Sequence, residues 1–314
     1  MKKNRRLIHF QLSYTWAIAT CLLLIGCSTD EDISLREKSI IYCSEGSPES
    51  FNPQTVTSGT TIDAIANQLY NRLITYNTED NSIVPAIAKS WHVTRDGKKV
   101  TFYLRKDIPF HQTRYFTPTR SLNADDVLFS FNRILDKESQ YHQVVAGNFP
   151  YFQNVNFGGL VNKIEKINDY TVRFSLNYPD ASFLAHLAST YAVILSKEYA
   201  DQLSLASNEK QIDQLPIGTG PYKYQEYKTG SLIRYYKHPD YWQETNDAQQ
   251  VVFDITPNNS GRLAKLLAGE CDLVAYPIAH QPIINNPNLT LESVTSLNVA
   301  YLGFNTAKPP FNNK

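Results

Sequence analysis

Two adjacent carboxylates, Asp125 and Asp126, are the residues of this 314-residue chain whose types and spacing come nearest to acid–base chemistry. A pair of carboxyl groups can act as general acid and general base when their surroundings separate their pKa values. Both residues follow Asn123 and open the segment "ADDVLFSFNRILD", whose apolar residues recur at helical spacing. Asn is a preferred N-cap, and the first turn of a helix favours negative charge. We therefore interpret the pair as a helix start and not as a catalytic site.

No other motif in the sequence indicates catalysis or metal binding. There is no G-x-S-x-G, H-E-x-x-H, G-K-[ST] or G-x-G-x-x-G pattern. The seven histidines are scattered, and we interpret each as a surface residue or as one whose hydrogen bonds are satisfied. The glycine loop "GTGPY" at 218–222 precedes a strand, whereas a phosphate-binding loop precedes a helix, so its predicted role is structural. We expect a protein that is not an enzyme and that has no metal site and no cofactor.

The overall composition is that of a folded protein without a strong electric field. Hydrophobic residues make up 42% of the chain and charged residues 19%, and thirty basic residues balance thirty acidic ones. Because no net positive charge attracts polyanions, nucleic acid is not an expected partner. The aromatic content is high, with 20 tyrosines and 15 phenylalanines. Most of these must pack in the core, but surplus tyrosine also suits a cleft that binds small ligands.

The N-terminus has the pattern of an export signal. A basic start, "MKKNRR", is followed by an apolar stretch at 14–25 that is too short for a permanent membrane span. It ends in "LIGC", which matches the bacterial lipobox, in which Cys27 becomes the lipidated first residue of the mature chain. The alternative is an ordinary signal peptide that happens to contain cysteine. We predict a signal peptide at 1–26, a lipidated tether at 27–37, and a periplasmic protein anchored to the cell membrane or outer membrane.

Two cysteines, Cys43 and Cys271, remain after this segment is set aside. In an oxidising compartment a remaining pair suggests one disulfide, and two separate buried thiols are the alternative. A disulfide that closes so long a loop would stabilise the fold by up to ~5 kcal/mol in the chain-entropy model.

Helices and strands alternate irregularly along the chain, which predicts a mixed α/β fold. We expect an opening strand at 38–46 and an amphipathic helix at 61–74 after a threonine cap. A strand at 98–108, a hairpin at 163–177 and two strands within 218–242 should follow. The segment 251–276 reads as strand, helix and strand, with Gly269 at the C-cap of the helix. A further strand pattern occupies 298–305.

Several long blocks of the sequence resemble the family 5 extracellular solute-binding proteins, the peptide-binding components of ABC importers. They include "IVPAIAKSWHVTRDGKKVTFYLRKDIPFH", "FTPTRSLNADDVLFSFNRILD" and "PIGTGPYKY". The blocks "IYCSEGSPESFNPQTVTSGTT" and "SGRLAKLLAGECDLVAYP" are similar to the dipeptide-binding and Sap branches of that family. The resemblance extends over nearly all of the chain after the tether.

The resemblance implies a periplasmic-binding-protein-like fold of type II, with two lobes that close on ligand by hinge motion. It implies a first lobe at 38–62 and 180–304, with a small subdomain inserted at 63–179 and a disulfide between Cys43 and Cys271. Residues 305–314 would begin the hinge crossing to a second lobe that is absent here. We accordingly expect a truncated form, in which binding is severely impaired.

The resemblance also implies the function and the binding residues. Peptide would be held mainly through its backbone, like an added strand, and Thr57, Ser58 and Gly59 are the expected ligand contacts. The full-length activity would be non-catalytic capture of antimicrobial, oligo- or dipeptides and delivery to an ABC permease in the inner membrane. The alternatives are a haem- or dipeptide-specific lipoprotein of the same family, or a lipid-anchored structural or chaperone-like lobe that transports nothing.

Overall fold

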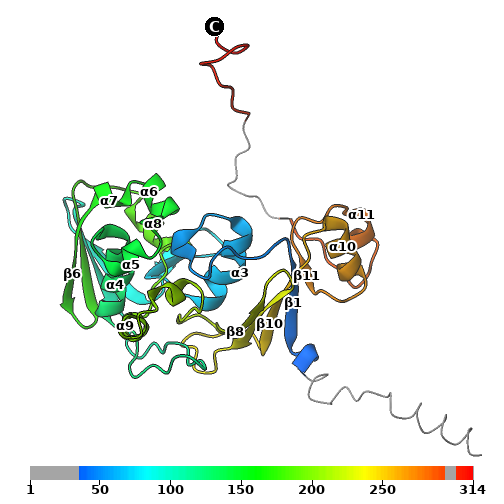
Figure 1. Cartoon of the computed structure of the whole chain (residues 1–314), viewed down its shortest axis with the longest axis horizontal. Coiled ribbons are helices and arrows are strands. Elements are labelled where there is room, and N and C mark those ends of the chain that lie inside the picture. The colour runs from blue at the N-terminus through cyan, green and yellow to red at the C-terminus, as the bar shows by residue number, and fades with distance from the viewer. Residues whose placement is uncertain (1–34, 294–301, 314) are drawn as a thin grey trace, which may run out of the picture. The chain divides into compact units, whose positions relative to one another are not determined.

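The computed structural model describes residues 35–293 and 302–313 (Figure 1). The described residues up to Tyr276 form one compact unit, and those from Pro277 onward form a second, small one. The predicted signal peptide and the predicted lipidation site Cys27 lie outside the described residues. So do residues 298–301 of the strand pattern predicted at 298–305, and the described part, 302–305, has no regular secondary structure.

The first unit contains a five-stranded sheet in the order β11-β1-β10-β9-β8. Its strands are β1 (Ser39–Ser44), β8 (Tyr222–Lys228), β9 (Leu232–Lys237), β10 (Gln250–Ile255) and β11 (Leu273–Val274). Strand β1 pairs in parallel with both β10 and β11, whereas β9 pairs antiparallel with β8 and β10. The sheet is therefore mixed, and the chain adopts the predicted α/β fold.

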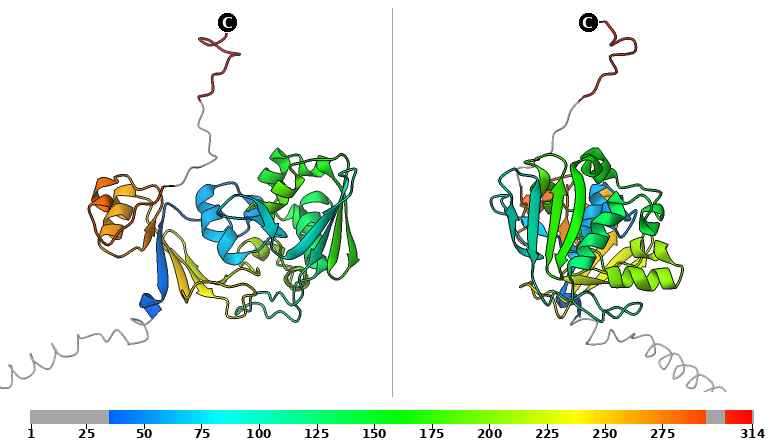
Figure 2. Two further views of the ribbon diagram at one scale, coloured as in Figure 1. Left: turned by 180° about the vertical axis from the view of Figure 1, so that it is seen from behind. Right: turned by 90° about the vertical axis from the view of Figure 1, so that its left-hand side faces the viewer.

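A second, four-stranded antiparallel sheet has the order β4-β5-β7-β6. Its strands are β4 (Ala88–Val93), β5 (Lys99–Leu104), β6 (Val161–Asn168) and β7 (Thr171–Leu176). Alternation along β5 and β7 buries Val100, Phe102, Val172 and Phe174 on one face, and helix α4 (Ala124–Leu135) contacts β6 and β7. In the right-hand view of Figure 2 this sheet lies in front and α4 behind it. A short pair, β2 (Ile74–Tyr76) and β3 (Ile83–Pro85), completes the strands of the described part.

The remaining helices are mostly short and connect the strands. They are η2 (Pro53–Thr55), α3 (Gly59–Leu69), α5 (Gln140–Gln143), α6 (Pro150–Asn154), α7 (Phe157–Leu160), α8 (Phe183–Ala188), α9 (Lys197–Leu205), η3 (Glu209–Asp213) and α10 (Asn259–Leu267). The second unit contains α11 (Gln281–Ile284). The division of the chain into a first lobe and an inserted subdomain stays a prediction, and its proposed boundary after residue 62 falls inside α3.

Helix α3 differs from the sequence-based prediction at both ends. Its N-cap is Ser58 rather than a threonine, and it stops at Leu69 instead of continuing to Ile74. The carbonyl of Leu69 accepts a hydrogen bond from the backbone N–H of Gly220, 151 positions further along in the "GTGPY" loop, at 3.0 Å. This contact takes the place of the next helical hydrogen bond, and Tyr70 turns to extended backbone.

The structure joins Cys43, on β1, to Cys271, which precedes β11, by a disulfide. Of the two alternatives that the sequence left open, the disulfide is confirmed. It links the strand that opens the sheet to the loop that leads into the neighbouring edge strand.

Candidate functional site

The parallel strands of the five-stranded sheet end together at one edge. Strands β1, β10 and β11 run in the same direction and finish at Ser44, Ile255 and Val274. In α/β sheets, ligands bind in crevices outside the carboxyl ends of the strands. This edge is therefore the first place to look for a binding site.

The three predicted ligand contacts lie directly before or at the start of α3. Thr57 and Gly59 are exposed, and Ser58 is half-buried at the N-cap without a side-chain hydrogen bond to the helix. A Cβ at Gly59 would meet no atom within 4 Å, so packing does not require glycine there. The structure does not test contact with ligand, and these three residues stay predicted contacts.

A cavity of about 270 Å³ opens at this edge of the sheet. Strand β1 contributes Tyr42 and Ser44 and is followed by Glu45, the start of α3 contributes Gly59, Thr60 and Asp63, and Tyr276 follows β11. One of the three predicted contacts, Gly59, thus lines the cavity, and Thr57 and Ser58 do not.

A larger cavity of about 450 Å³ adjoins the first one and shares Tyr42 and Asp63 with it. Its walls are mostly apolar and aromatic and include Ile40, Val251 and Phe253 of the sheet. Polar side chains from α3, among them Asn67 and Gln68, complete the lining. Together the two cavities have the apolar walls and the few convergent polar groups that small-molecule sites share.

Acidic groups dominate the electrostatics of the smaller cavity. Burial raises the pKa of the Asp63 carboxyl, and the charge of Glu45 raises it further. Burial raises the pKa of Tyr42 to about 12, with Asp63 and Glu45 contributing in the same direction. The sequence analysis did not identify Tyr42, Glu45 or Asp63. The only local signal was the position of Glu45 near the end of the strand predicted at 38–46.

The "GTGPY" loop has the structural role that the sequence predicted. Its two glycines lie against the end of α3: a Cβ at Gly220 would lie 2.5 Å from the carbonyl oxygen of Gln68. The Gly220 carbonyl accepts hydrogen bonds from His111 Nε2 at 2.9 Å and from His238 Nδ1 at 3.2 Å. His111 Nδ1 accepts from the N–H of Gly218 at 3.3 Å, which assigns the proton of this ring to Nε2. Both histidines are buried and hydrogen-bonded, as the sequence analysis expected.

We expect the buried His111 to make the fold sensitive to mild acid. Burial and then the neighbouring His238 lower the pKa of His111 from 6.5 to about 3. Above pH 6.5 neither the folded nor the unfolded state is protonated, so His111 has no effect there. Between pH 6.5 and about 3, His111 is protonated in the unfolded state but stays neutral in the folded state. The free energy of unfolding therefore falls by about 1.4 kcal/mol for each pH unit in this range.

Urea unfolding at pH 7.5 and pH 5 checks this prediction. The difference in unfolding free energy between the two pH values should shrink by about 2 kcal/mol in His111→Gln. A pH dependence identical to that of the wild type would contradict the assignment. His92→Gln is the matched control, because His92 is exposed on β4.

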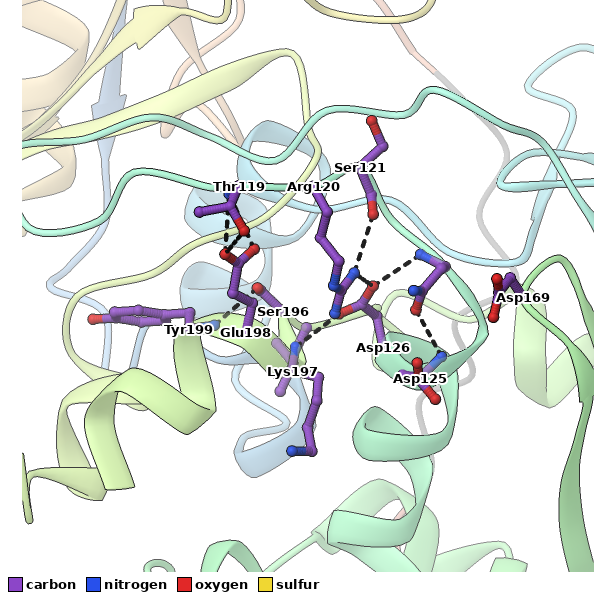
Figure 3. A network of polar contacts seen from close by, with 12 residues as sticks. Thr119, Arg120, Ser121, Asp125, Asp126, Asp169, Ser196, Lys197, Glu198 and Tyr199 are labelled. Atoms are coloured by element: carbon purple, nitrogen blue, oxygen red, sulfur yellow. Dashed lines mark hydrogen bonds and ion pairs between the residues drawn. The ribbon is translucent and has the colours of Figure 1, made fainter. Parts of the chain in front are cut away.

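The carboxylate pair at 125–126 is structural, as predicted. Asn123 caps α4, and the Asp126 carboxylate accepts from the Asn123 N–H at 2.9 Å, which completes a capping box. Asp126 also accepts two hydrogen bonds from Arg120, at 2.6 and 2.9 Å, and one from the Lys197 N–H at 2.8 Å (Figure 3). With its buried carboxylate occupied by four donors, Asp126 has no lone pair free for a substrate.

The described part of the chain contains no cluster of metal ligands and no membrane-spanning helix. No group of three or more His, Cys, Asp or Glu side chains in 35–293 or 302–313 could hold a metal ion. Within the same residues, no helix has both the length and the apolar character needed to cross a membrane.

Comparison with known proteins identifies the family. Residues 82–314 match the family described as bacterial extracellular solute-binding proteins, family 5 Middle. The chain belongs to the family 5 solute-binding proteins. It is 44% identical over 281 residues to the probable ABC transporter periplasmic-binding protein SapA of Escherichia coli, a match that covers 89% of this chain and 51% of that protein. It is 41% identical to heme-binding protein A of Haemophilus influenzae, with 89% and 52% covered.

Solved structures agree with this assignment. The dipeptide-binding protein of Pseudoalteromonas sp. SM9913, crystallised with Met-Leu, shares 47% identity with a TM-score of 0.85. The match covers 88% of this chain and 55% of that one. This family 5 chain therefore spans about half the length of the relatives it matches, and the resemblance found in the sequence is confirmed.

Proposed function

We propose that this chain is the first lobe of a peptide-binding component of an ABC transporter. The observation that carries the proposal is the pair of cavities that share Tyr42 and Asp63 at the carboxyl edge of the parallel strands, in a chain of a solute-binding family. Peptide would lie across residues 57–59, held largely by backbone hydrogen bonds. The relatives in this family bind solutes and are not enzymes.

The cellular setting belongs to the same proposal. A signal peptide at 1–26, lipidation of Cys27 and a tether to residue 37 would hold the protein in the periplasm at a membrane surface. Its partner would be an ABC permease in the inner membrane. Lobe I at 38–62 and 180–304, the subdomain at 63–179 and a hinge from 305 are the proposed parts of the chain.

Haem is the second candidate ligand, because one relative is a heme-binding protein 41% identical to this chain. The two cavities offer no histidine, cysteine or methionine, and among the common axial ligands of haem iron only tyrosine lines them. Peptide is therefore the favoured ligand.

An NMR titration of the 314-residue chain with Met-Leu tests the proposal. We expect saturable shifts with a dissociation constant of about 1 mM or weaker, because walls such as Leu273 and Tyr276 are 54% and 75% exposed and leave the ligand in water. No shift at concentrations well above this range would contradict peptide binding, and micromolar affinity would contradict the expectation of weak binding.

Variants at position 59 test the predicted contacts in the same titration. Gly59→Ala should leave stability unchanged, since the site is open, but should weaken Met-Leu binding by ~3-fold or more if peptide backbone passes close to it. Gly158→Ala is the matched control, because a Cβ there also meets nothing within 4 Å. Equal affinity of the two variants would remove Gly59 from the site.

A titration of the chain with haem, followed by the Soret absorption band, separates the two ligand classes. The titration is repeated in the presence of Met-Leu to measure whether the dipeptide competes with haem.

A further inference from the structure

Two buried histidines from distant parts of the chain donate to the same carbonyl group. His111 and His238 are 0% and 3% exposed, and their rings meet edge to face with centroids 4.9 Å apart. His111 Nε2 and His238 Nδ1 both donate to the Gly220 carbonyl of the "GTGPY" loop. The His111 N–H also donates to the Gly218 carbonyl, and the His238 N–H donates to the Pro221 carbonyl at 2.8 Å. This histidine pair therefore fixes the position of the loop.

The loop that the histidine pair holds also forms a wall of the larger cavity. Pro221 and Tyr222 line this cavity together with Gln68 of α3. The hydrogen bond from the Gly220 N–H to the Leu69 carbonyl, at 3.0 Å, joins the same loop to the end of α3. Release of the loop would therefore move this wall of the cavity and free the end of α3.

The hydrogen bonds of His111 admit only its neutral form. Its Nε2 carries a proton, because a carbonyl oxygen can only accept, and its Nδ1 accepts from the Gly218 N–H at 3.3 Å. A second proton would lie on Nδ1 and face the Gly218 N–H, donor against donor. His111 can therefore bind this proton only when the loop has moved away, and acid favours that open form.

The groups around the pair oppose protonation as well. Burial is the largest cause that lowers the pKa of each ring, and His238 lowers that of His111 further. Lys223, on β8, lowers the pKa of both rings, whereas Asp240, after β9, raises that of His238. The Tyr241 ring centroid lies 6.5 Å from that of His238, and burial raises the pKa of its hydroxyl, which stays neutral. Among these side chains only Asp240 favours a charged histidine, and it is exposed, so water weakens its effect.

We propose that His111 and His238 are positioning residues of the ligand site, which hold the "GTGPY" loop against α3 at neutral pH and release this wall of the larger cavity when acid protonates them. The inference rests on the proposed peptide-binding function and adds to it a regulation of the same site by pH. The closed form binds peptide, and the open form, which binds up to two more protons, lacks the intact wall.

Hydrogen–deuterium exchange of the Gly220 N–H in the 314-residue chain measures the opening of the loop. The opening constant, corrected for the intrinsic exchange rate, should rise about 30-fold or more between pH 7.5 and pH 5, because the freed His111 regains its ordinary pKa of 6.5. The opening is local, so its constant should exceed by about tenfold or more that of Leu104, whose N–H donates to the Tyr170 carbonyl at 2.8 Å. Equal constants for the two amides at both pH values, or a Gly220 constant that does not change with pH, would overturn the proposal.

Glutamine variants separate protonation from hydrogen bonding. The side-chain amide in His111→Gln can still accept from Gly218 and donate to Gly220, but it does not titrate. The pH-dependent rise should be about 30-fold smaller in this variant, and below ~2-fold in His111→Gln/His238→Gln. His92→Gln is the matched control, because His92 is exposed on β4, and it should keep the whole rise. An unchanged rise in His111→Gln would assign the pH dependence to other groups and overturn the proposal, and the wild-type comparison decides it even where a variant fails to fold.

Addition of Met-Leu tests the link between the loop and the ligand site. At ten times its dissociation constant the dipeptide should slow exchange of the Gly220 N–H about tenfold at pH 5, because it binds the closed form only. Binding without this slowing would separate the loop from the site and overturn the proposal, while peptide binding stands. If Met-Leu does not bind, the proposed function fails together with the regulation of the site, and the exchange data still show whether the histidine pair holds the loop.

Discussion

Gly218→Ala is expected to lower the free energy of unfolding by about 3 kcal/mol or more. A Cβ at this position would overlap the carbonyl oxygen of Leu69 and lie 2.7 Å from the Tyr70 ring. The neighbours cannot move apart cheaply, because the loop is fixed on both sides. The Gly220 N–H donates to the Leu69 carbonyl, and the Gly218 carbonyl accepts from the His111 N–H at 2.9 Å. The methyl group must therefore break these contacts or shift α3.

Urea unfolding of Gly218→Ala beside Gly158→Ala measures this effect. Gly158 has open space around its Cβ position, so its variant should stay within about 0.5 kcal/mol of the wild type. A change of similar size in both variants would show that the close approach of the loop to α3 is absent in solution. Because α3 carries Gly59 and Asp63, Gly218→Ala should also weaken peptide binding, which the same NMR titration measures.

Removal of the Arg133 side chain is expected to cost 3–5 kcal/mol, in the range found when one partner of a buried ion pair is deleted. The Arg133 side chain is fully buried and donates to Asp213 with Nη1 at 2.9 Å and Nη2 at 2.6 Å. Its Nε donates to the Tyr141 carbonyl at 3.1 Å. Asp213, whose side chain is 11% exposed, also accepts from Asn52 at 2.7 Å. Arg133→Met would leave this carboxylate with one donor and no counter-charge.

A double-mutant cycle separates the charge effect from lost packing. Asp213→Asn removes the uncompensated charge, so the Arg133→Met/Asp213→Asn pair should be less destabilised than the sum of the two single variants. Lys163→Met is the control, since the Lys163–Glu165 pair lies on the surface and should contribute little. Strict additivity in the cycle would contradict a direct charge interaction between Arg133 and Asp213.

Features that depend on near neighbours follow from the order of residue types alone. The capping box of Asn123 and Asp126, the β6–β7 hairpin and the Gly269 turn after α10, with its φ of 73°, all rest on contacts within a few residues. Capping, turn chemistry and alternation act locally and can be read from the order of residue types. The family was also evident from the sequence, because its motifs are long and continuous.

Features that join distant parts of the chain arise from tertiary contacts and could not be predicted from local patterns. Helical periodicity continues to Ile74, yet α3 ends at Leu69 because a glycine 151 positions away donates to that carbonyl. The burial of Arg133 likewise depends on Asp213, 80 positions away, whose carboxylate accepts from its guanidinium group.

The candidate site also brings together residues from distant parts of the chain. Tyr42 and Glu45 meet Asp63 only because β1 runs parallel to β10 and its carboxyl end leads to α3. Burial, charge pairing and cavity shape arise from contacts between residues far apart in the chain, and local propensity carries no information about those contacts.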